Sequence, residues 1–299
     1  MPKTKFYKAF GLIIESDFVI AQIPETDCRR VDVRIVRADL SGLTPGERKF
    51  LQEDAIYARV EGVAAFRVTG GSLIQVDPEP GCSDSRLGVF LMGSSMGAIL
   101  HQRGCIPLHG SCVTDGKRSI LLTGDSGVGK STLAAEFLRR GWKLITDDVS
   151  ALYDTEGVPM VQSSYPSQKL WQDALDRYER PESDIHSLYF TDSREKFGVD
   201  VSRYFFDGRA PLSLVVRLVP NMPRCDLAPI EGMTRVDQLM RNTYRSNMIE
   251  KRNLQRHFQR CVTLATKIPM ALVARTPGAD CAGRMYDLIT EFLEEKHHD

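Results

Sequence analysis

The stretch that decides the fold is Ser119-Ile120-Leu121-Leu122-Thr123-Gly124-Asp125-Ser126-Gly127-Val128-Gly129-Lys130-Ser131-Thr132. Residues 124–131 fit the pattern G-x-x-x-x-G-K-[ST] in full. The apolar run 119–123 predicts a short buried strand before this loop, and residues 131–140 predict a helix after it, ended by Gly141. A glycine-rich loop between a strand and a helix is the setting in which this pattern binds phosphate groups.

The chemistry expected of this loop follows from its backbone. Glycines let consecutive N–H groups turn inward around phosphate oxygens, and the N-terminus of the helix adds a positive dipole. Lys130 is expected to reach the β- and γ-phosphates of ATP, and the Ser131 hydroxyl is expected to ligate Mg²⁺. The residues predicted to bind the nucleotide are Gly124, Asp125, Ser126, Gly127, Val128, Gly129, Lys130, Ser131 and Thr132.

Two carboxylates, Asp147 and Asp148, follow the next predicted strand, residues 142–146. The intervening helix is about as long as a parallel β–α–β crossover requires, which predicts that both carboxylates lie beside the loop, where ligands bind in open α/β sheets. One carboxylate can hold Mg²⁺ while the other accepts a proton from an attacking hydroxyl. An exposed Asp-Asp turn is the plainer alternative.

A histidine precedes the loop in a second predicted strand. Residues 106–113 indicate this strand, and the turn residues 114–118 predict that it folds back on the strand that enters the loop. In a hairpin centred on Gly116, His109 lies opposite Thr123. A histidine there can reach the γ-phosphate or orient an aspartate, although a lone histidine in a strand is more often structural.

Four segments in order resemble the catalytic core of the HPr kinase/phosphorylase family: L-H-G-S (108–111), G-D-S-G-V-G-K-S (124–131), R-G-W-K-L-I (140–145) and T-D-D (146–148). The resemblance implies a P-loop core built like that of phosphoenolpyruvate carboxykinase. It also implies that Asp147 is the general base toward a serine hydroxyl, that His109 takes part in the chemistry, and that Asp148 is the metal-binding or supporting carboxylate. Two features depart from the family pattern. Thr132 follows Ser131 where these kinases usually carry glutamate, and their downstream E-[IVL]-R-G-L-G-type signature is not recognisable.

Other parts of the chain resemble a neighbouring group, the HPr-kinase-like proteins of ribosomal-peptide gene clusters and in particular the lasso-peptide kinases. These parts are the β-rich N-terminal region, the segment L-x-G-x-x-x-G-x-x-L-H-Q-R-G (91–104) and residues 165–171. This resemblance implies phosphorylation of the C-terminal serine of a precursor peptide, with ATP and Mg²⁺ as cofactors and the peptide as partner. Basic residues that are candidates to bind the peptide carboxylate are Lys169, Arg194, Lys196 and Arg203, and solvated surface charges are the alternative.

Other functions stay open at this point. The chain is expected to be a serine kinase, and an HPr-type protein serine kinase is the nearest alternative. A nucleotide-gated module that binds the peptide without modifying it is a second alternative, and a carboxykinase acting on small acids is a third. The carboxylate pair disfavours the binding module, because binding alone needs no base.

Composition narrows the protein class. The chain has 299 residues with 39 basic and 39 acidic side chains, and this zero net charge disfavours nucleic acid as the main partner. Seven scattered cysteines without a C-x-x-C pair fit a reducing compartment. No apolar run is long enough to span a bilayer. We therefore expect a cytoplasmic protein without a membrane partner, and we leave homo-oligomerisation open.

The predicted architecture is α/β, with an HPr-kinase/PEP-carboxykinase-like P-loop core and a smaller β-rich N-terminal domain. The predicted domains are residues 1–103, including a connecting helix, and residues 104–299. Expected elements are strands at 5–16 and 32–36, a hairpin of 58–68 and 72–76 around Gly70-Gly71, a helix at 84–102, a hairpin turn at 154–157, a basic helix at 234–264, a strand at 271–274 and a helix at 281–295. In the helix 84–102, Gly93 and Gly97 lie one turn apart and permit another element to approach closely. The basic helix is expected to pack on the core, with a peptide-docking or lid helix as the alternative.

Overall fold

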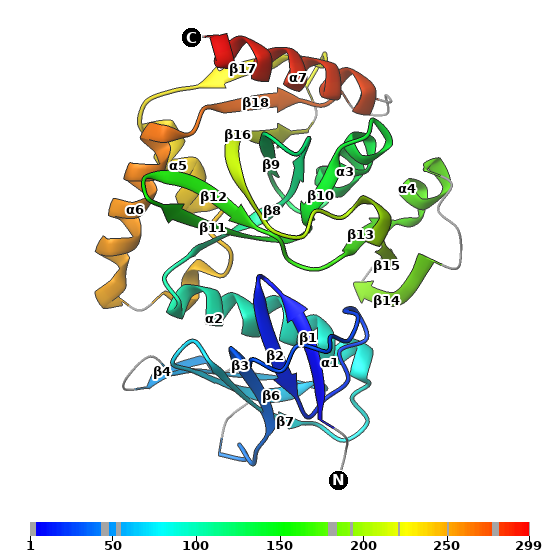
Figure 1. Ribbon diagram of the computed structural model, residues 1–299, viewed down its shortest axis with the longest axis vertical. Helices are drawn as coiled ribbons and strands as arrows, with labels where there is room; N and C mark the ends of the chain where they lie inside the picture. Colours follow the sequence, from blue (N-terminus) through cyan, green and yellow to red (C-terminus); the bar gives the residue numbers. More distant parts are fainter. Residues whose placement is uncertain are drawn as a thin grey trace.

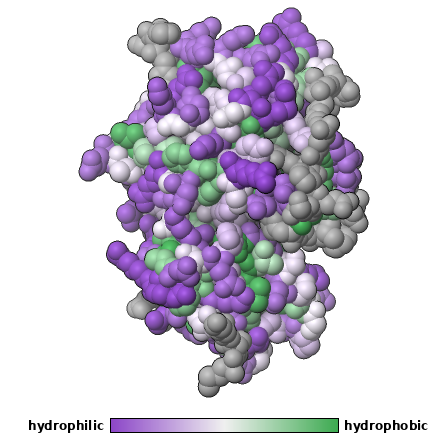
Figure 2. Space-filling model, turned by 45° about the vertical axis from the view of Figure 1, so that its right-hand side comes forward, coloured by the Kyte–Doolittle hydropathy of each residue, from purple (hydrophilic) through white to green (hydrophobic). Residues whose placement is uncertain are grey.

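The structure is a computed structural model, and it describes residues 4–42, 48–51, 55–178, 184–191, 194–220, 222–249, 251–276 and 281–298. Figure 1 shows an N-terminal sheet in blue and cyan, a larger mixed core in green to orange, and a helix between them. Polar and apolar side chains are interspersed over the face shown in Figure 2. No helix in the described part of the chain is long and apolar enough to cross a membrane.

The N-terminal sheet has seven strands in the order β1-β2-β3-β7-β6-β5-β4. Their bounds are β1 Lys5–Ala9, β2 Leu12–Ser16, β3 Val33–Arg37, β4 Arg48–Leu51, β5 Ala55–Val60, β6 Ala64–Thr69 and β7 Leu73–Pro78. The hairpin turn at Gly70-Gly71 is confirmed, with φ values of 60° and 63°. The predicted strand 5–16 is instead a hairpin, because Phe10 and Gly11 both take positive φ values. The predicted strand 58–68 is interrupted by a turn at residues 61–63, between β5 and β6.

The connecting helix is confirmed and consists of α1 (Asp84–Phe90), a π-helical turn η1 (Leu91–Ser95) and α2 (Met96–Gln102). Its apolar residues pack into the core of the N-terminal sheet. Among them, Leu91, Met96 and Ile99 are fully buried. The expected close approach occurs at its glycines. A Cβ added at Gly93 or Gly97 would lie 3.1 Å or 3.0 Å from the side chain of Tyr244.

The larger core is an eight-stranded mixed sheet in which two long strands have several neighbours. Its strands are β8 Ile106–Thr114, β9 Ser119–Thr123, β10 Lys143–Thr146, β11 Val149–Thr155, β12 Val158–Gln162, β16 Arg209–Val219, β17 Leu227–Ile230 and β18 Met270–Ala274. The C-terminal part of β8 pairs with β9 on one side and β10 on the other, while its N-terminal part pairs with β11. The short break between β10 and β11 therefore lies opposite the middle of β8.

The β8–β9 hairpin is confirmed, but its register differs from the prediction by one residue. Gly110, not His109, lies opposite Thr123. The strands before and after helix α3 (Lys130–Arg139) run parallel to each other, as predicted, because β9 and β10 are both antiparallel to β8. The two strands are not adjacent, since β8 lies between them. The predicted turn at residues 154–157 joins β11 and β12, where Thr155 pairs with Val158.

A three-stranded sheet in the order β13-β15-β14 adjoins the core. Its strands are β13 Ser167–Trp171, β14 Ile185–Thr191 and β15 Arg194–Asp200, with helix α4 at Gln172–Arg177 and the 3₁₀ turn η3 at Ser202–Tyr204. Strand β13 contacts α3, the helix that follows the glycine loop. This contact brings the small sheet to the phosphate-loop side of the core.

The predicted helix 234–264 is in fact two helices. They are α5 (Met233–Arg241) and α6 (Leu254–Lys267), separated by the 3₁₀ turns η4 (Ser246–Met248) and η5 (Lys251–Asn253). The break includes Arg245 at φ 51° and an isolated bridge between Thr243 and Leu108 of β8. The terminal helix is confirmed as α7 (Ala282–His298), which packs on α3.

The change from one sheet to the other falls between β7 and β8, on either side of the connecting helix. The hydrophobic cluster of the N-terminal sheet nevertheless includes Val149, Ala151 and Tyr165 from the larger core. The two sheets are thus joined through shared apolar packing. The division into domains at 103/104 stays a prediction.

Candidate active site

The glycine loop lies between β9 and α3, as predicted. Gly124 has φ 134°, and a Cβ there would lie 2.7 Å from the carbonyl oxygen of Leu218 in β16. Gly127 and Gly129 take φ values of 82° and 105°, and Gly129 precedes the first residue of α3. These backbone conformations are ones that residues with a Cβ rarely adopt. The motif glycines are therefore required by the loop geometry itself.

Lys130 opens α3 and folds back over the loop. Its side-chain nitrogen donates to the carbonyl oxygens of Gly124 at 2.9 Å and Asp125 at 3.0 Å, and the residue is 8% exposed. The ammonium group is thus held at the loop, where the phosphates of a nucleotide would sit. A buried ammonium with fixed direction is a strong phosphate partner, because little ordering remains to be done on binding.

Asp147 lies in the break between β10 and β11 and is 5% exposed. One carboxylate oxygen accepts hydrogen bonds from the hydroxyl of Ser131 at 3.1 Å and the hydroxyl of Ser111 at 2.5 Å. The other oxygen accepts from the backbone N–H of Lys169 at 2.8 Å. Asp147 therefore contacts directly the serine that is expected to hold Mg²⁺.

Asp148 points to a different set of partners. Its φ of 75° turns the chain, so that its carboxylate lies 2.6 Å from the ammonium of Lys169 and 3.3 Å from Nδ1 of His109. Burial alone would raise the pKa of Asp148, but the positive charge of Lys169 and the hydrogen bond from His109 hold it well below its usual range. Asp148 is consequently a carboxylate anion at neutral pH.

His109 is oriented by the backbone of the aspartate pair. Its Nδ1 donates to the carbonyl oxygen of Asp148 at 3.0 Å, and its ring stacks on Tyr244 with 6.1 Å between centroids. A carbonyl oxygen can only accept, so this contact places a proton on Nδ1. Nε2 is left as the ring nitrogen that can exchange a proton with another group.

Together these residues surround a pocket of about 90 Å³. It is lined by His109, Ser111, Ser126, Gly127, Gly129, Lys130, Ser131, Thr132, Asp147, Asp148, Leu170 and Trp171. The structure therefore brings the predicted histidine, loop residues and aspartates to one place.

Ser111 and Lys169 hold the aspartates by contacts that the sequence motifs did not indicate. Ser111 has no role in the motif reading, although it is two residues after His109 in a strand, and such residues share a face. Lys169 was expected to bind substrate, but its backbone and side chain hold the two aspartates. No sequence signal indicates that β13 lies beside α3.

Of the other proposed substrate residues, Arg203 is the one whose side chain is described. Arg203 is exposed on η3 and does not line the pocket. Lys196 and Arg194 belong to β15, but their side chains fall outside the part of the structure that is described.

The oxygen donors fit Mg²⁺. The hydroxyl of Ser131 and the carboxylate of Asp147 are hard ligands of the kind that this ion prefers. The described residues contain no group of three His, Cys, Asp or Glu side chains that could hold a metal ion. Mg²⁺ bound with a nucleotide uses only one or two protein carboxylates together with phosphate oxygens, so the pair is sufficient.

Comparison with known proteins identifies the segment that carries this site. Residues 104–172 match the family model described as HPr Serine kinase C-terminal domain. This segment of the chain is HPr-kinase-like. The HPr-kinase-like segment contains every residue that lines the pocket, from His109 to Trp171.

Individual relatives match over a short part of the chain. The HPr kinase/phosphorylase of Clostridium beijerinckii is 46% identical over 50 residues, which cover 17% of this chain and 17% of that protein. The HPr kinase/phosphorylase of Limosilactobacillus reuteri is 52% identical over 46 residues, or 15% of this chain and 14% of that one. The chain therefore aligns with less than a fifth of the length of these relatives. The structure of the Hpr(Ser) kinase/phosphatase from Coxiella burnetii gives a TM-score of 0.35 at 13% identity, over 64% of this chain and 98% of that chain.

Proposed function

We propose that the chain is an ATP- and Mg²⁺-dependent kinase that phosphorylates a serine hydroxyl. The observation that carries this proposal is the contact between the Ser131 hydroxyl and Asp147. It joins the phosphate loop to the aspartate pair inside residues 104–172, the segment that matches the HPr Serine kinase C-terminal domain. A carboxylate beside the loop serine, with a second carboxylate next to it, is what phosphoryl transfer to a hydroxyl requires.

The two aspartates are proposed to have different roles. The resemblance implies that Asp147 is the base and that Asp148 is the metal-binding or supporting carboxylate. The contacts favour the opposite division, because Asp147 accepts a hydrogen bond from the expected metal-binding hydroxyl, whereas Asp148 lies beside His109. We therefore propose that Asp147 and Ser131 bind the metal ion, and that Asp148 and His109 accept the proton of the substrate hydroxyl.

The reaction then proceeds as follows. Backbone N–H groups of the loop and Lys130 would bind the phosphates. Ser131 and Asp147 would hold Mg²⁺, which would supply positive charge near the γ-phosphate oxygens. Asp148 accepts the proton of the substrate serine hydroxyl while the serine oxygen attacks the γ-phosphorus in line. The new bond joins the serine oxygen to phosphorus, and the bond to the β–γ bridging oxygen breaks and releases ADP.

The acceptor is proposed to be the C-terminal serine of a ribosomally made precursor peptide of the lasso type. The resemblance of the N-terminal region and of residues 91–104 to lasso-peptide kinases supports this choice. An HPr-type protein is the second candidate, supported by the relatives named HPr kinase/phosphorylase.

Mass spectrometry distinguishes these substrates. The chain is incubated with ATP, Mg²⁺ and either a peptide that ends in serine, the same peptide with an amidated C-terminus, or HPr. The proposal expects the addition of one phosphoryl group to the terminal serine of the free-acid peptide and little to the amidated form. Phosphorylation of HPr alone would replace the peptide with the second candidate. Nucleotide-dependent binding of the peptide without a mass change would instead indicate a binding module.

A further inference from the structure

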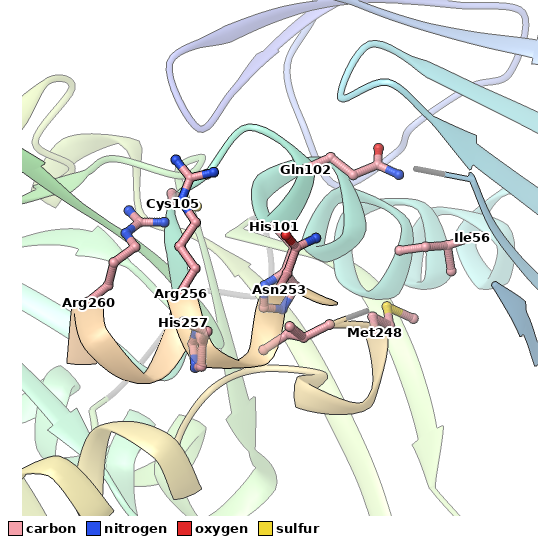
Figure 3. A pocket seen from close by; sticks show the side chains of 11 residues that line it. Ile56, His101, Gln102, Cys105, Met248, Asn253, Arg256, His257 and Arg260 are labelled. Atoms are coloured by element: carbon pink, nitrogen blue, oxygen red, sulfur yellow. The ribbon is translucent and has the colours of Figure 1, made fainter. Parts of the chain in front are cut away.

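A second cavity lies away from the aspartate pair, between the connecting helix and α6. Its volume is about 450 Å³, and its lining includes His101 of α2, Cys105, and the α6 residues Arg256, His257 and Arg260. Figure 3 shows both guanidinium groups rising from α6 toward the turn that follows α2. Ile56 and Met248 form an apolar side of the same cavity.

The described residues that line this cavity carry positive charge and no carboxylate. No Asp or Glu lines the cavity, and neither arginine has an ion pair, among the residues that the structure describes. The carboxylate of Asp154, whose charge acts on Arg260, is bound to Lys267 at 2.8 Å. Burial first, and then the charge of Arg256, lower the pKa of Arg260. Two guanidinium groups on adjacent turns of one helix repel each other, so an anion between them would be stabilised.

Three other polar side chains of the cavity, those of Gln102, His257 and His101, have hydrogen-bond partners. Gln102 accepts from the backbone of Gly71 at 2.8 Å and donates to Val68 at 3.2 Å. His257 contacts the hydroxyl of Thr243 at 3.0 Å, and His101 contacts the carbonyl oxygen of Tyr244 at 2.8 Å. Burial lowers the pKa of His257 to about 4 and that of His101 below its usual value, so both rings are neutral at pH 7. The charge available to a ligand is therefore that of the two arginines.

The N-terminus of α6 adds to the positive electrostatic potential in the cavity. The helix begins at Leu254, Asn253 lines the cavity immediately before it, and the first turn carries no acidic residue. A helix N-terminus carries partial positive charge on its unpaired N–H groups. Arginine side chains and helix dipole thus act in the same direction.

We propose that this cavity is a second anion site, in which Arg256 and Arg260 bind a small molecule carrying two or more phosphate or carboxylate groups. The site is independent of the phosphate loop, and it does not depend on the kinase activity proposed above. Guanidinium groups bind both phosphate and carboxylate through paired N–H donors. The test below therefore uses one phosphate anion and one carboxylate anion to distinguish the two ligand classes.

The test uses the full chain with Lys130→Ala, which weakens the phosphate loop as a competing anion site. Binding of inorganic pyrophosphate and of citrate is measured by calorimetry and by thermal unfolding, at constant ionic strength set with sodium chloride. We expect the anion to bind, and we expect its affinity to fall at least about tenfold when Arg256→Gln and Arg260→Gln are added. Arg241→Gln is the matched control, because Arg241 is an exposed arginine paired with Asp237 outside this cavity, and it should leave binding unchanged.

The outcomes separate the two sources. A response to pyrophosphate assigns a phosphate ligand, and a response to citrate assigns a carboxylate ligand. The proposal is overturned if neither anion binds, or if the arginine variants bind as tightly as the control. Because Arg260 is half-buried, Arg256→Gln alone is also measured, and it should weaken binding without a change of unfolding temperature in the absence of anion.

Discussion

The ammonium group of Lys169 lies 2.6 Å from a carboxylate oxygen of Asp148. The backbone N–H of the same lysine donates to Asp147 at 2.8 Å. A single residue of β13 therefore fixes the direction of both carboxylates. Strand β13 belongs to a different sheet from the phosphate loop, so the site is complete only when the small sheet is in place.

Lys169→Met is expected to reduce kcat at least about tenfold and to change its pH dependence. The positive charge of Lys169 helps to lower the pKa of Asp148, so this carboxylate stays ionised even at pH values below the usual carboxyl range. Without it, the pKa of Asp148 rises because burial is no longer offset, so activity should fall at a higher pH as the solution is acidified. The pH–rate profile of kcat measures this shift. Lys169→Arg keeps the charge and is the control, and an unchanged profile in Lys169→Met would contradict the role given to this pair.

Asp147→Asn and Asp148→Asn are expected to fail in different ways. Asp147→Asn should raise the Mg²⁺ concentration for half-maximal rate at least about tenfold, because it weakens the ligand beside Ser131. Asp148→Asn should bind ATP and Mg²⁺ normally and lose at least about a hundredfold in kcat. Rates measured across a Mg²⁺ titration, with Asp154→Asn in the exposed turn as control, decide the matter. The reverse pattern would return the base to Asp147.

Lys130→Ala should weaken ATP binding at least about tenfold, since the ammonium group that meets the phosphates is removed. Calorimetric titration with ATP and Mg²⁺ measures the affinity. Lys143→Ala removes an exposed lysine at the start of β10 and should leave the affinity unchanged. Equal ATP affinity in the two variants would be inconsistent with the phosphate loop described above.

Two glycines of the loop should differ in their effect on stability. Gly124→Ala places a Cβ 2.7 Å from the Leu218 carbonyl, at φ 134°, and should lower the free energy of unfolding by about 2–3 kcal/mol. Gly127→Ala meets no atom within 4 Å and should lower it by about 1 kcal/mol, from the left-handed backbone alone. Urea denaturation without nucleotide gives both values. A larger loss at Gly127 than at Gly124 would show that the contact with β16 is unimportant.

Local sequence signals predicted the phosphate loop, the β8–β9 hairpin and the connecting helix, because each depends on residues close together in the chain. The register of the hairpin was one residue out, since the pattern marks a turn without fixing which residues pair across it. The helix predicted for 234–264 was wrong at its centre. Its apolar spacing continues across residues 242–253, while the pairing of Thr243 with Leu108 depends on a strand more than a hundred residues earlier.

The same limit applies to the site. The aspartates and His109 were found because the motifs mark them. The partnership of Lys169 with both aspartates depends on how one sheet docks against another, which no local pattern contains. The two aspartate side chains point to different partners, and Asp148 has a positive φ; the proposed division of roles rests on this difference.

Tyr244 connects the helix between the two sheets to the active site. Its side chain packs against Gly93 and Gly97, its carbonyl oxygen accepts from His101, and its ring stacks on His109. A larger residue at either glycine would displace the ring that supports His109, although neither glycine lines the active-site pocket. Selection for catalysis would then act on the size of residues in a helix remote from the nucleotide, and the N-terminal half of the chain would be constrained in evolution by chemistry performed in the other half.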